Sequence, residues 1–525
     1  MHAPCWTCRS RTIQCDQTSI PCAKCEKAGL ECFEKRPLRW VEGVAIRGKM
    51  RGRVLGGDPK DSGKNPVAQL KRKQILHSCA KSLATNITPP FALQDPCIHD
   101  LDWSSRFYLD YCGFIETLMF PWTKDNVRIA KLYILYDSER NPFRTLLTYA
   151  MDDLILRKCI IAVAARHFAN TGRSFDQADD ALSPRFVNAN LDALNFKKQT
   201  IKALSLSLSM SHLERFHKDK IMATILLLIF LDLLESGIDG WKYHLHGAEG
   251  LVNLSHSLLK PGVSEYVNSD PGETVEETRR FIARQFSLSI STIGGALSDS
   301  KSRPELCINF DESRYQESMI RSFLGCPGFL LGAIRYFSNQ RYMIENLYIH
   351  GDISLHEQIR NTLTMLELTV NFDCLKWASD SVQPIASSTV EIQKLFLLSQ
   401  AYRTATVLYG NRVLCAFKTS TRTIAFDNKE LVSRLLDVID SLKCDAALFK
   451  CLLWPTFIAG LECQSHSEQK LVIKSLKMLW NLTCCLNVIN ASRILHDYWK
   501  RKHFDSNLAP EESEFHVIEQ GWLLI

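Results

Sequence analysis

Six cysteines near the amino terminus constrain this chain more than any other feature. They follow the spacing C-x2-C-x6-C twice, with six residues between the two copies, at Cys5, Cys8, Cys15, Cys22, Cys25 and Cys32. Few apolar side chains lie between them, so a hydrophobic core cannot stabilise so short a segment. Bonds to the sulfur atoms must therefore hold it folded.

The number of sulfur atoms limits the kind of site. One tetrahedral zinc ion needs four ligands, and two separate ions need eight. Six thiolates supply eight ligand positions if two of them bridge both ions, and the symmetry of the halves predicts that the bridging cysteines are equivalent residues. The alternative is three disulfides. Because the sequence begins Met1-His2-Ala3-Pro4-Cys5, with no room for a secretory signal, we favour a reducing compartment and two zinc ions.

The segment CWTCRSRTIQCDQTSIPCAKCEKAGLEC resembles the DNA-binding module of the fungal six-cysteine binuclear zinc-cluster transcription factors. The residues that match the usual pattern of that family are Arg9, Arg11, Cys15-Asp16 and Lys24. This resemblance implies that the first and fourth cysteines, Cys5 and Cys22, bridge the two zinc ions. It also implies that the helix after Cys8 enters the major groove of double-stranded DNA and reads a CGG-like triplet.

Two positions depart from the pattern of that family. Its reader lysines fall on Thr12 and Gln14 here, and threonine is short where lysine can donate to guanine O6 and N7. The residues expected to contact DNA are Arg9, Arg11, Thr12 and Gln14 in the major groove and Lys24, Lys35 and Arg36 at phosphates. Two interpretations stay open. The chain is either a sequence-specific regulator of RNA polymerase II transcription, or a zinc-cluster protein with weakened base readout that acts as a transcriptional cofactor or protein-interaction module.

Basic charge is concentrated at the same end of the chain. The 525 residues carry a net charge of +6, but residues 1–78 hold 16 Lys/Arg against 7 Asp/Glu, so this part is +9 and the rest is −3. A cationic head on a weakly anionic body is expected where the head meets phosphates. We therefore predict a binuclear zinc-cluster DNA-binding domain at 1–40, a basic flexible linker at 41–95 and a regulatory body at 96–525. The linker has no sustained apolar heptad, so a coiled coil is not predicted there, and a homodimer through other surfaces stays open.

From about residue 96 onward, apolar residues recur at helical spacing and strand-like alternation is rare. The segment TLLTYAMDDLILRKCIIAVAARHFA predicts two helices that break near Asp152-Asp153. An apolar run from Ile221 to Leu234 is shorter than a membrane span, so it predicts a buried helix that Gly237 ends. Further helical stripes are Leu395, Leu398, Tyr402, Ala405 and Tyr409, and later Leu476, Leu479 and Leu482. The predicted fold class is mainly α, a small zinc-cluster module and a large all-α body, with no membrane segment.

This body also resembles a known family. The blocks DKIMATILLLIFLDLLESGIDGWKYHLHGAEGLV and GCPGFLLGAIRYFS are similar to the fungal-specific transcription factor regulatory domain. The segment LRWVEGVAIRGKMRG, after the cysteines, is similar to the acriflavine-sensitivity control-type regulators. The resemblance implies an α-helical regulatory domain that acts with the transcription machinery in the nucleus. It identifies no small-molecule inducer and no target gene, and it does not separate an activator from a repressor.

Catalytic motifs are missing from the sequence. It contains no G-x-S-x-G, no H-E-x-x-H and no G-x-G-x-x-G after a strand. His244 and His246 are two residues apart, so they face different sides of a helix and are not expected to share a metal ion. The sequence therefore predicts a protein that is not an enzyme.

Overall fold

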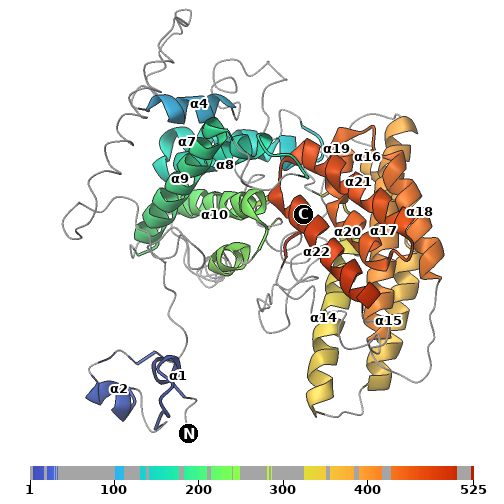
Figure 1. The fold of residues 1–525 in the computed structure, drawn as a ribbon, viewed down its shortest axis with the longest axis horizontal. Coiled ribbons are helices and arrows are strands. Elements are labelled where there is room, and N and C mark those ends of the chain that lie inside the picture. Colours follow the sequence, from blue (N-terminus) through green and yellow to red (C-terminus); the bar gives the residue numbers. More distant parts are fainter. Residues whose placement is uncertain are drawn as a thin grey trace, which may run out of the picture. The chain divides into compact units, whose positions relative to one another are not determined.

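The computed structural model describes residues 4–16, 21–28, 30, 32–33, 101–111, 131–137, 141–176, 183–209, 215–238, 240–248, 281–282, 285, 324–350, 355–382, 389–416, 427–504 and 522–524. The predicted linker at 41–95 lies outside them. The chain forms two compact units, Met1–Leu93 and Gln94–Ile525. Throughout the described residues the regular elements are helices (Figure 1), and the strand-type pairing found there is an isolated bridge between Ile238 and Trp522. The mainly α fold class is confirmed.

The first unit contains two helices of five residues, α1 (Trp6–Ser10) and α2 (Ala23–Lys27). Each begins directly after the first cysteine of a C-x2-C pair, so each pair lies on one helical turn. Cys5, Cys8, Cys22 and Cys25 form the buried centre of this unit, and Cys15 and Cys32 pack against it. Cysteines therefore occupy the place that apolar side chains take in a larger domain.

The second unit begins with helices that we call the N-terminal helical group: α4 (Trp103–Tyr111), α7 (Pro142–Asp152), α8 (Leu154–Thr171), α9 (Pro184–Leu208) and α10 (Arg215–Glu235). Asn141 caps α7, and Pro142 takes its first position, where a helix needs no amide hydrogen. Asp153 ends α7 and caps α8, since its carboxylate accepts hydrogen bonds of 2.9 Å from two amides of that helix. The predicted break at Asp152-Asp153 is confirmed. Helix α8 packs against α4, α7, α9 and α10.

Helix α10 is buried along the apolar run that predicted it, with almost every side chain from Ile221 to Leu234 inaccessible to solvent. Asp232, the charged residue in the run, pairs with Lys197 of α9 at 2.7 Å, and Lys197 pairs with Glu235 at 2.5 Å. Gly237 follows the helix at a φ of 70°, which favours glycine, so the predicted stop is confirmed. No helix among the described residues is long and apolar enough to cross a membrane.

The helix at 240–248 separates the two neighbouring histidines. His244 is buried, with Nε2 at 3.5 Å from Oδ2 of Asp232, whereas His246 is exposed. Burial lowers the pKa of His244 to about 3, and the charge of Lys197 acts in the same direction, so this imidazole is neutral at physiological pH. The two side chains do not share a site, as their spacing predicts.

The remaining helices form what we call the C-terminal helical group: α14 (Gly328–His350), α15 (Leu355–Val370), α16 (Cys374–Val382), α17 (Thr389–Cys415), α18 (Asn428–Ser441), α19 (Ala446–Phe449), the 3-10 turn η7 (Lys450–Leu452), α20 (Leu453–Glu462), α21 (His466–Thr483) and α22 (Leu486–Phe504). Helix α17 packs against α14, α15, α16, α18 and α20. Its predicted stripe is confirmed, because the following residues are all buried: Leu395, Leu398, Tyr402, Ala405 and Tyr409.

One predicted core position in α21 is wrong. Leu482 is 37% exposed, whereas Leu476 and Leu479 are buried as expected. The buried stripe continues instead to Trp480, which is four residues after Leu476 and therefore on the same face. Leu482 lies in the last turn before the helix ends at Thr483, beside that stripe.

Side-chain amides join the two helical groups where α10 packs against α22. Asn170 of α8 donates to the carbonyl of Leu234 and to the carbonyl of Cys484, both at 2.8 Å. Asn490 of α22 donates to Ser236 O at 2.8 Å, and the amide of Leu523 donates to Gly237 O at 2.9 Å. The turn that ends α10 is therefore held by the carboxyl-terminal part of the chain.

Candidate metal centre and nucleic-acid interface

The six cysteines of the first unit gather into two overlapping groups of four. In each group the sulfur atoms lie within 4.8 Å of one another. One group consists of Cys5, Cys8, Cys15 and Cys22, and the other of Cys5, Cys22, Cys25 and Cys32. Cys5 and Cys22 belong to both groups and are equivalent residues of the two halves.

The distances between the sulfurs fit tetrahedral zinc. Cys8 and Cys22 are 3.6 Å apart between Sγ atoms, Cys5 and Cys22 are 3.8 Å apart, and Cys15 and Cys5 are 3.9 Å apart. Zinc binds sulfur at about 2.3 Å, so the corners of its tetrahedron are about 3.8 Å apart. A disulfide bond would need about 2.05 Å. The six cysteines form no disulfide, and the alternative of three disulfides is wrong.

The two halves of the module are tied to each other at the starts of their helices. The amide of Trp6, the first residue of α1, donates to Phe33 O at 2.6 Å, and that of Ala23, the first residue of α2, donates to Oδ2 of Asp16 at 2.8 Å. Phe33 and Asp16 each follow the last cysteine of the opposite half. Since the first amides of a helix have no partner within it, each half supplies an acceptor that the other needs. A further bond, from the amide of Phe33 to Oγ1 of Thr7 at 3.1 Å, strengthens one of these ties.

Burial and hydrogen bonds give the cysteine thiols different pKa values. Burial raises the pKa of Cys8 to about 12 and also raises the pKa of Cys25. At Cys5, burial acts to raise the pKa, but hydrogen bonds from Cys8 outweigh it and the pKa is lowered. The backbone amide of Cys25 lowers the pKa of Cys22. The cysteines common to both groups, Cys5 and Cys22, therefore ionise more readily than Cys8 and Cys25, and a coordinated cation favours the thiolate form of each.

The helix expected after Cys8 lies elsewhere, which corrects the prediction. Helix α1 begins at Trp6, before Cys8, and ends at Ser10. It begins there because Cys5 acts as its cap, with Sγ accepting from the amide of Cys8 at 3.3 Å. Thiol caps are weak sequence signals, since Ser, Thr, Asp and Asn are the residues that usually mark a helix start.

The residues predicted to contact DNA are all exposed where the structure describes them, at Arg9, Arg11, Thr12, Gln14 and Lys24. Arg9 lies on α1 and Lys24 on α2, whereas Arg11 is the cap at the end of α1. Thr12 and Gln14 follow the helix and are not part of it. Lys35 and Arg36 lie outside the described residues.

Thr12 has a φ of 54°, in the left-handed region. Its amide donates to Arg9 O at 3.1 Å, and the amide of Ile13 donates to Cys8 O at 3.0 Å. This pair of bonds is the Schellman arrangement that ends many helices, usually with glycine at the left-handed position. The hydroxyl of Thr12 donates to Arg11 O at 2.7 Å, so the side chain is hydrogen-bonded to its own backbone.

Lys27 is an exposed basic residue that the sequence interpretation missed. It lies on α2, three residues after Lys24, so the two lysines are neighbours on one face of a short helix. The spacing was a usable signal, because Cys22 and Cys25 already implied a helical turn in the second half. Lys24 and Lys27 give that half a pair of cations, as Arg9 and Arg11 do for the first half.

Comparison with known families gives a family match for each of the two units. Residues 126–523 match the fungal specific transcription factor domain, and residues 3–40 match the fungal Zn(2)-Cys(6) binuclear cluster domain. The cluster domain binds two zinc ions, and the residues described above have the chemistry and spacing to hold them. Both families are transcription factor domains and not enzyme families.

Two curated proteins of Neurospora crassa are similar to the chain. Acriflavine sensitivity control protein acr-2 is 23% identical over 426 residues, which cover 78% of this chain and 64% of that protein. Transcriptional regulatory protein pro1 is 32% identical over 103 residues, 20% of this chain and 12% of that protein. The chain thus spans less than two thirds of either relative. No solved structure gives a significant match.

Taken with the double group of cysteines and the helical body, these matches show that the chain belongs to the fungal transcription factors that combine a Zn(2)-Cys(6) binuclear cluster with a fungal specific transcription factor domain.

Proposed function

We propose that this chain is a nuclear regulator of RNA polymerase II transcription that binds a CGG-like triplet through its zinc cluster. In this proposal the domains are the zinc cluster at 1–40, a basic linker at 41–95 and a helical regulatory body at 96–525. The zinc ligands are the six cysteines from Cys5 to Cys32, with Cys5 and Cys22 bridging. The observation that carries the proposal is the pair of four-sulfur groups that share those two residues at tetrahedral spacing.

The chemistry of the exposed side chains assigns their roles. Zinc supplies the cross-links that a module without an apolar core needs, so metal binding and folding of this unit are one equilibrium. Arg11 carries a planar guanidinium that can donate to both O6 and N7 of one guanine. Arg9 lies in the last turn of α1, two residues before Arg11. Lys24 and Lys27, with Lys35 and Arg36, supply cations for phosphates, which position the protein without reading sequence.

Binding to duplexes with and without a CGG triplet tests this function. We expect the zinc-loaded full chain to prefer the CGG duplex by about 10³-fold or more at physiological salt in a gel-shift titration. Arg11→Ala should weaken binding to the CGG duplex by about 1–3 kcal/mol and leave binding to the other duplex unchanged. Lys24→Ala should weaken binding to both duplexes and reduce the salt dependence of binding by about one charge. The control is Arg434→Ala, an exposed residue of α18 in the other unit. Equal affinity for the two duplexes would contradict the proposal.

A second candidate function is a zinc cluster with weakened base readout, acting as a cofactor or a protein-interaction module. The geometry of Thr12 favours it, because a short hydroxyl that is bonded to Arg11 O replaces a lysine of the usual pattern. Thr12→Lys distinguishes the two candidates. If position 12 faces a base, the lysine should raise the preference for CGG over a scrambled duplex, whereas an unchanged ratio would show that it does not.

A further inference from the structure

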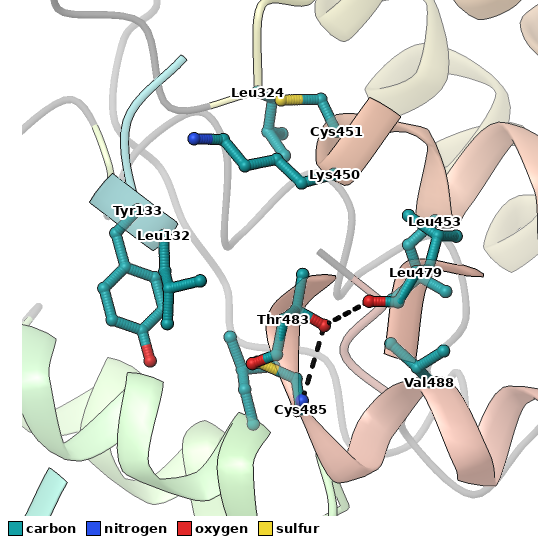
Figure 2. Close-up of a pocket in the computed structure, with 11 residues that line it drawn as sticks. Leu132, Tyr133, Leu324, Lys450, Cys451, Leu453, Leu479, Thr483, Cys485 and Val488 are labelled. Carbon is teal, nitrogen blue, oxygen red and sulfur yellow. Dashed lines mark hydrogen bonds between the residues drawn. The ribbon is translucent and has the colours of Figure 1, made fainter. Parts of the chain in front are cut away.

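A cavity of about 30 Å³ lies inside the second unit, where its two helical groups meet. Leu132 and Tyr133, in the segment 131–137, line one side together with Leu233 of α10. The other side is lined by η7, α20, α21 and the start of α22. Figure 2 shows Leu132 and Tyr133 facing Leu453, Leu479 and Val488 across the cavity. Both helical groups therefore contact whatever occupies it.

Most of the lining is apolar, and its polar side chains differ in their hydrogen-bond partners. The hydroxyl of Thr483 donates to Leu479 O at 2.9 Å and accepts from the amide of Cys485 at 3.4 Å, as the dashed lines in Figure 2 show. Lys450, by contrast, extends from η7 toward Tyr133 and Leu132. Its ammonium donates to the backbone carbonyl of Lys131, a neutral acceptor.

Lys450 is a partly buried cation without a carboxylate partner among the described residues. The two carboxylates that act on it from a distance, Asp137 and Asp445, are each paired elsewhere. Asp137 binds Arg144 at 2.7 Å, and Asp445 binds Lys394 at 2.7 Å. Burial lowers the pKa of Lys450, which is the cost of holding an ammonium where its charge is poorly compensated.

We infer that this cavity is a binding site for a small monoanion, the carboxylate of a short-chain organic acid, held by the ammonium of Lys450. An anion there supplies the missing opposite charge in a setting of low polarity, where a charge-assisted hydrogen bond is strong. The volume limits the buried part of the ligand to about the size of a carboxylate group, since a single water already needs about 10–15 Å³. Because the lining comes from both helical groups, the bound anion stabilises their contact.

Calorimetric titration of the zinc-loaded full chain with butyrate, and with n-butanol as the neutral analogue, tests the inference. We expect butyrate to bind and to raise the unfolding temperature of the second unit, and butanol to do neither. Lys450→Met should weaken butyrate binding about tenfold or more, whereas Lys450→Arg should retain it. The matched control is Lys443→Met, which removes an exposed lysine that pairs with Asp440 at 2.6 Å.

Competition with chloride distinguishes a site for any small monoanion from a site that binds only carboxylates. Displacement of butyrate by chloride would assign the site to small monoanions in general, and no displacement would restrict it to carboxylates, and either supports the inference. It is overturned if butyrate gives no binding, if butanol binds equally well, or if Lys450→Met binds butyrate like the unchanged chain. DNA binding is not part of this readout, so the result is independent of the proposed function.

Discussion

At the scale of single residues, Thr12 occupies a backbone conformation that disfavours its own side chain. A β-branched residue at positive φ crowds its Cβ against the backbone, at about 1–2 kcal/mol. The equivalent position of the second half, four residues after the second cysteine of its C-x2-C pair, is Gly29 in the sequence. The amide of Leu30 donates to Cys25 O at 3.0 Å, which repeats the bond from Ile13 to Cys8 O in the first half. The second half thus repeats, of the two hydrogen bonds that end α1, the one that spans more residues.

Thr12→Gly should therefore stabilise the zinc-loaded first unit by about 1 kcal/mol, because glycine adopts this φ without the steric cost, although it gains entropy in the unfolded chain. The measurement is the midpoint of unfolding in denaturant at fixed free zinc. Thr12→Ala is the control, since it removes the hydroxyl and keeps a Cβ. If alanine stabilised as much as glycine, the side chain of threonine and not its φ would be responsible.

At the scale of elements, a polar network fastens four helices of the C-terminal helical group. Arg412 of α17 donates to Glu462 of α20 at 2.7 Å and to Tyr498 OH of α22 at 3.1 Å. Asn428 of α18 donates to the second oxygen of Glu462 at 3.3 Å. The guanidinium also lies over the ring of Tyr498, at 5.5 Å from its centroid. These contacts of Arg412 and Glu462 fix how the four helices are arranged.

Glu462→Gln should destabilise the second unit by about 3 kcal/mol or more, because it leaves the buried charge of Arg412 without its counterion. Glu430→Gln is the matched control, since it breaks an exposed i,i+4 pair with Arg434 on α18 and should cost only about 0.3–0.5 kcal/mol. Denaturant unfolding checks both variants, with the slope unchanged. Similar losses for the two would show that burial adds nothing to the pair.

Helical periodicity predicted much of the second unit from the sequence alone. The stripe on α17 and the break at Asp152-Asp153 follow from local patterns, because side-chain spacing and an acidic cap are properties of adjacent residues. The cap of Cys5 was missed, since a thiol is rarely recognised as one. The contact of Lys450 with Lys131, 319 residues apart, has no local signature at all. The cysteine groups, by contrast, could be predicted from spacing, because all six ligands lie within 28 residues of one another in the sequence.

At the scale of the whole molecule, the two units are stabilised by different means. The first has a centre of cysteines, and the second has one continuous apolar core that both helical groups share. Removing metal acts on bonds that only the first unit uses. The second unit keeps its burial and its hydrogen bonds, since no group of three or more metal-ligating side chains occurs in the described part of it.

Chelation of zinc should therefore unfold the first unit and leave the helical circular-dichroism signal nearly unchanged, because the long helices belong to the second unit. Thermal unfolding of the second unit should keep its midpoint with and without chelator. Lowering the pH should act like chelator on the first unit, as protons compete with zinc for the thiolates. A single transition that both units share, lost as one on chelation, would contradict this independence.

The exchange of acceptors between Phe33 and Trp6, and between Asp16 and Ala23, bears on how such a module could arise. A peptide with one cysteine repeat would lack the partner for its own first amide, and its three cysteines would leave its zinc ion one ligand short of four. It could complete itself only against another copy. The zinc module therefore has the form of a symmetric dimer whose subunits have been fused, and neither repeat should fold as a monomer.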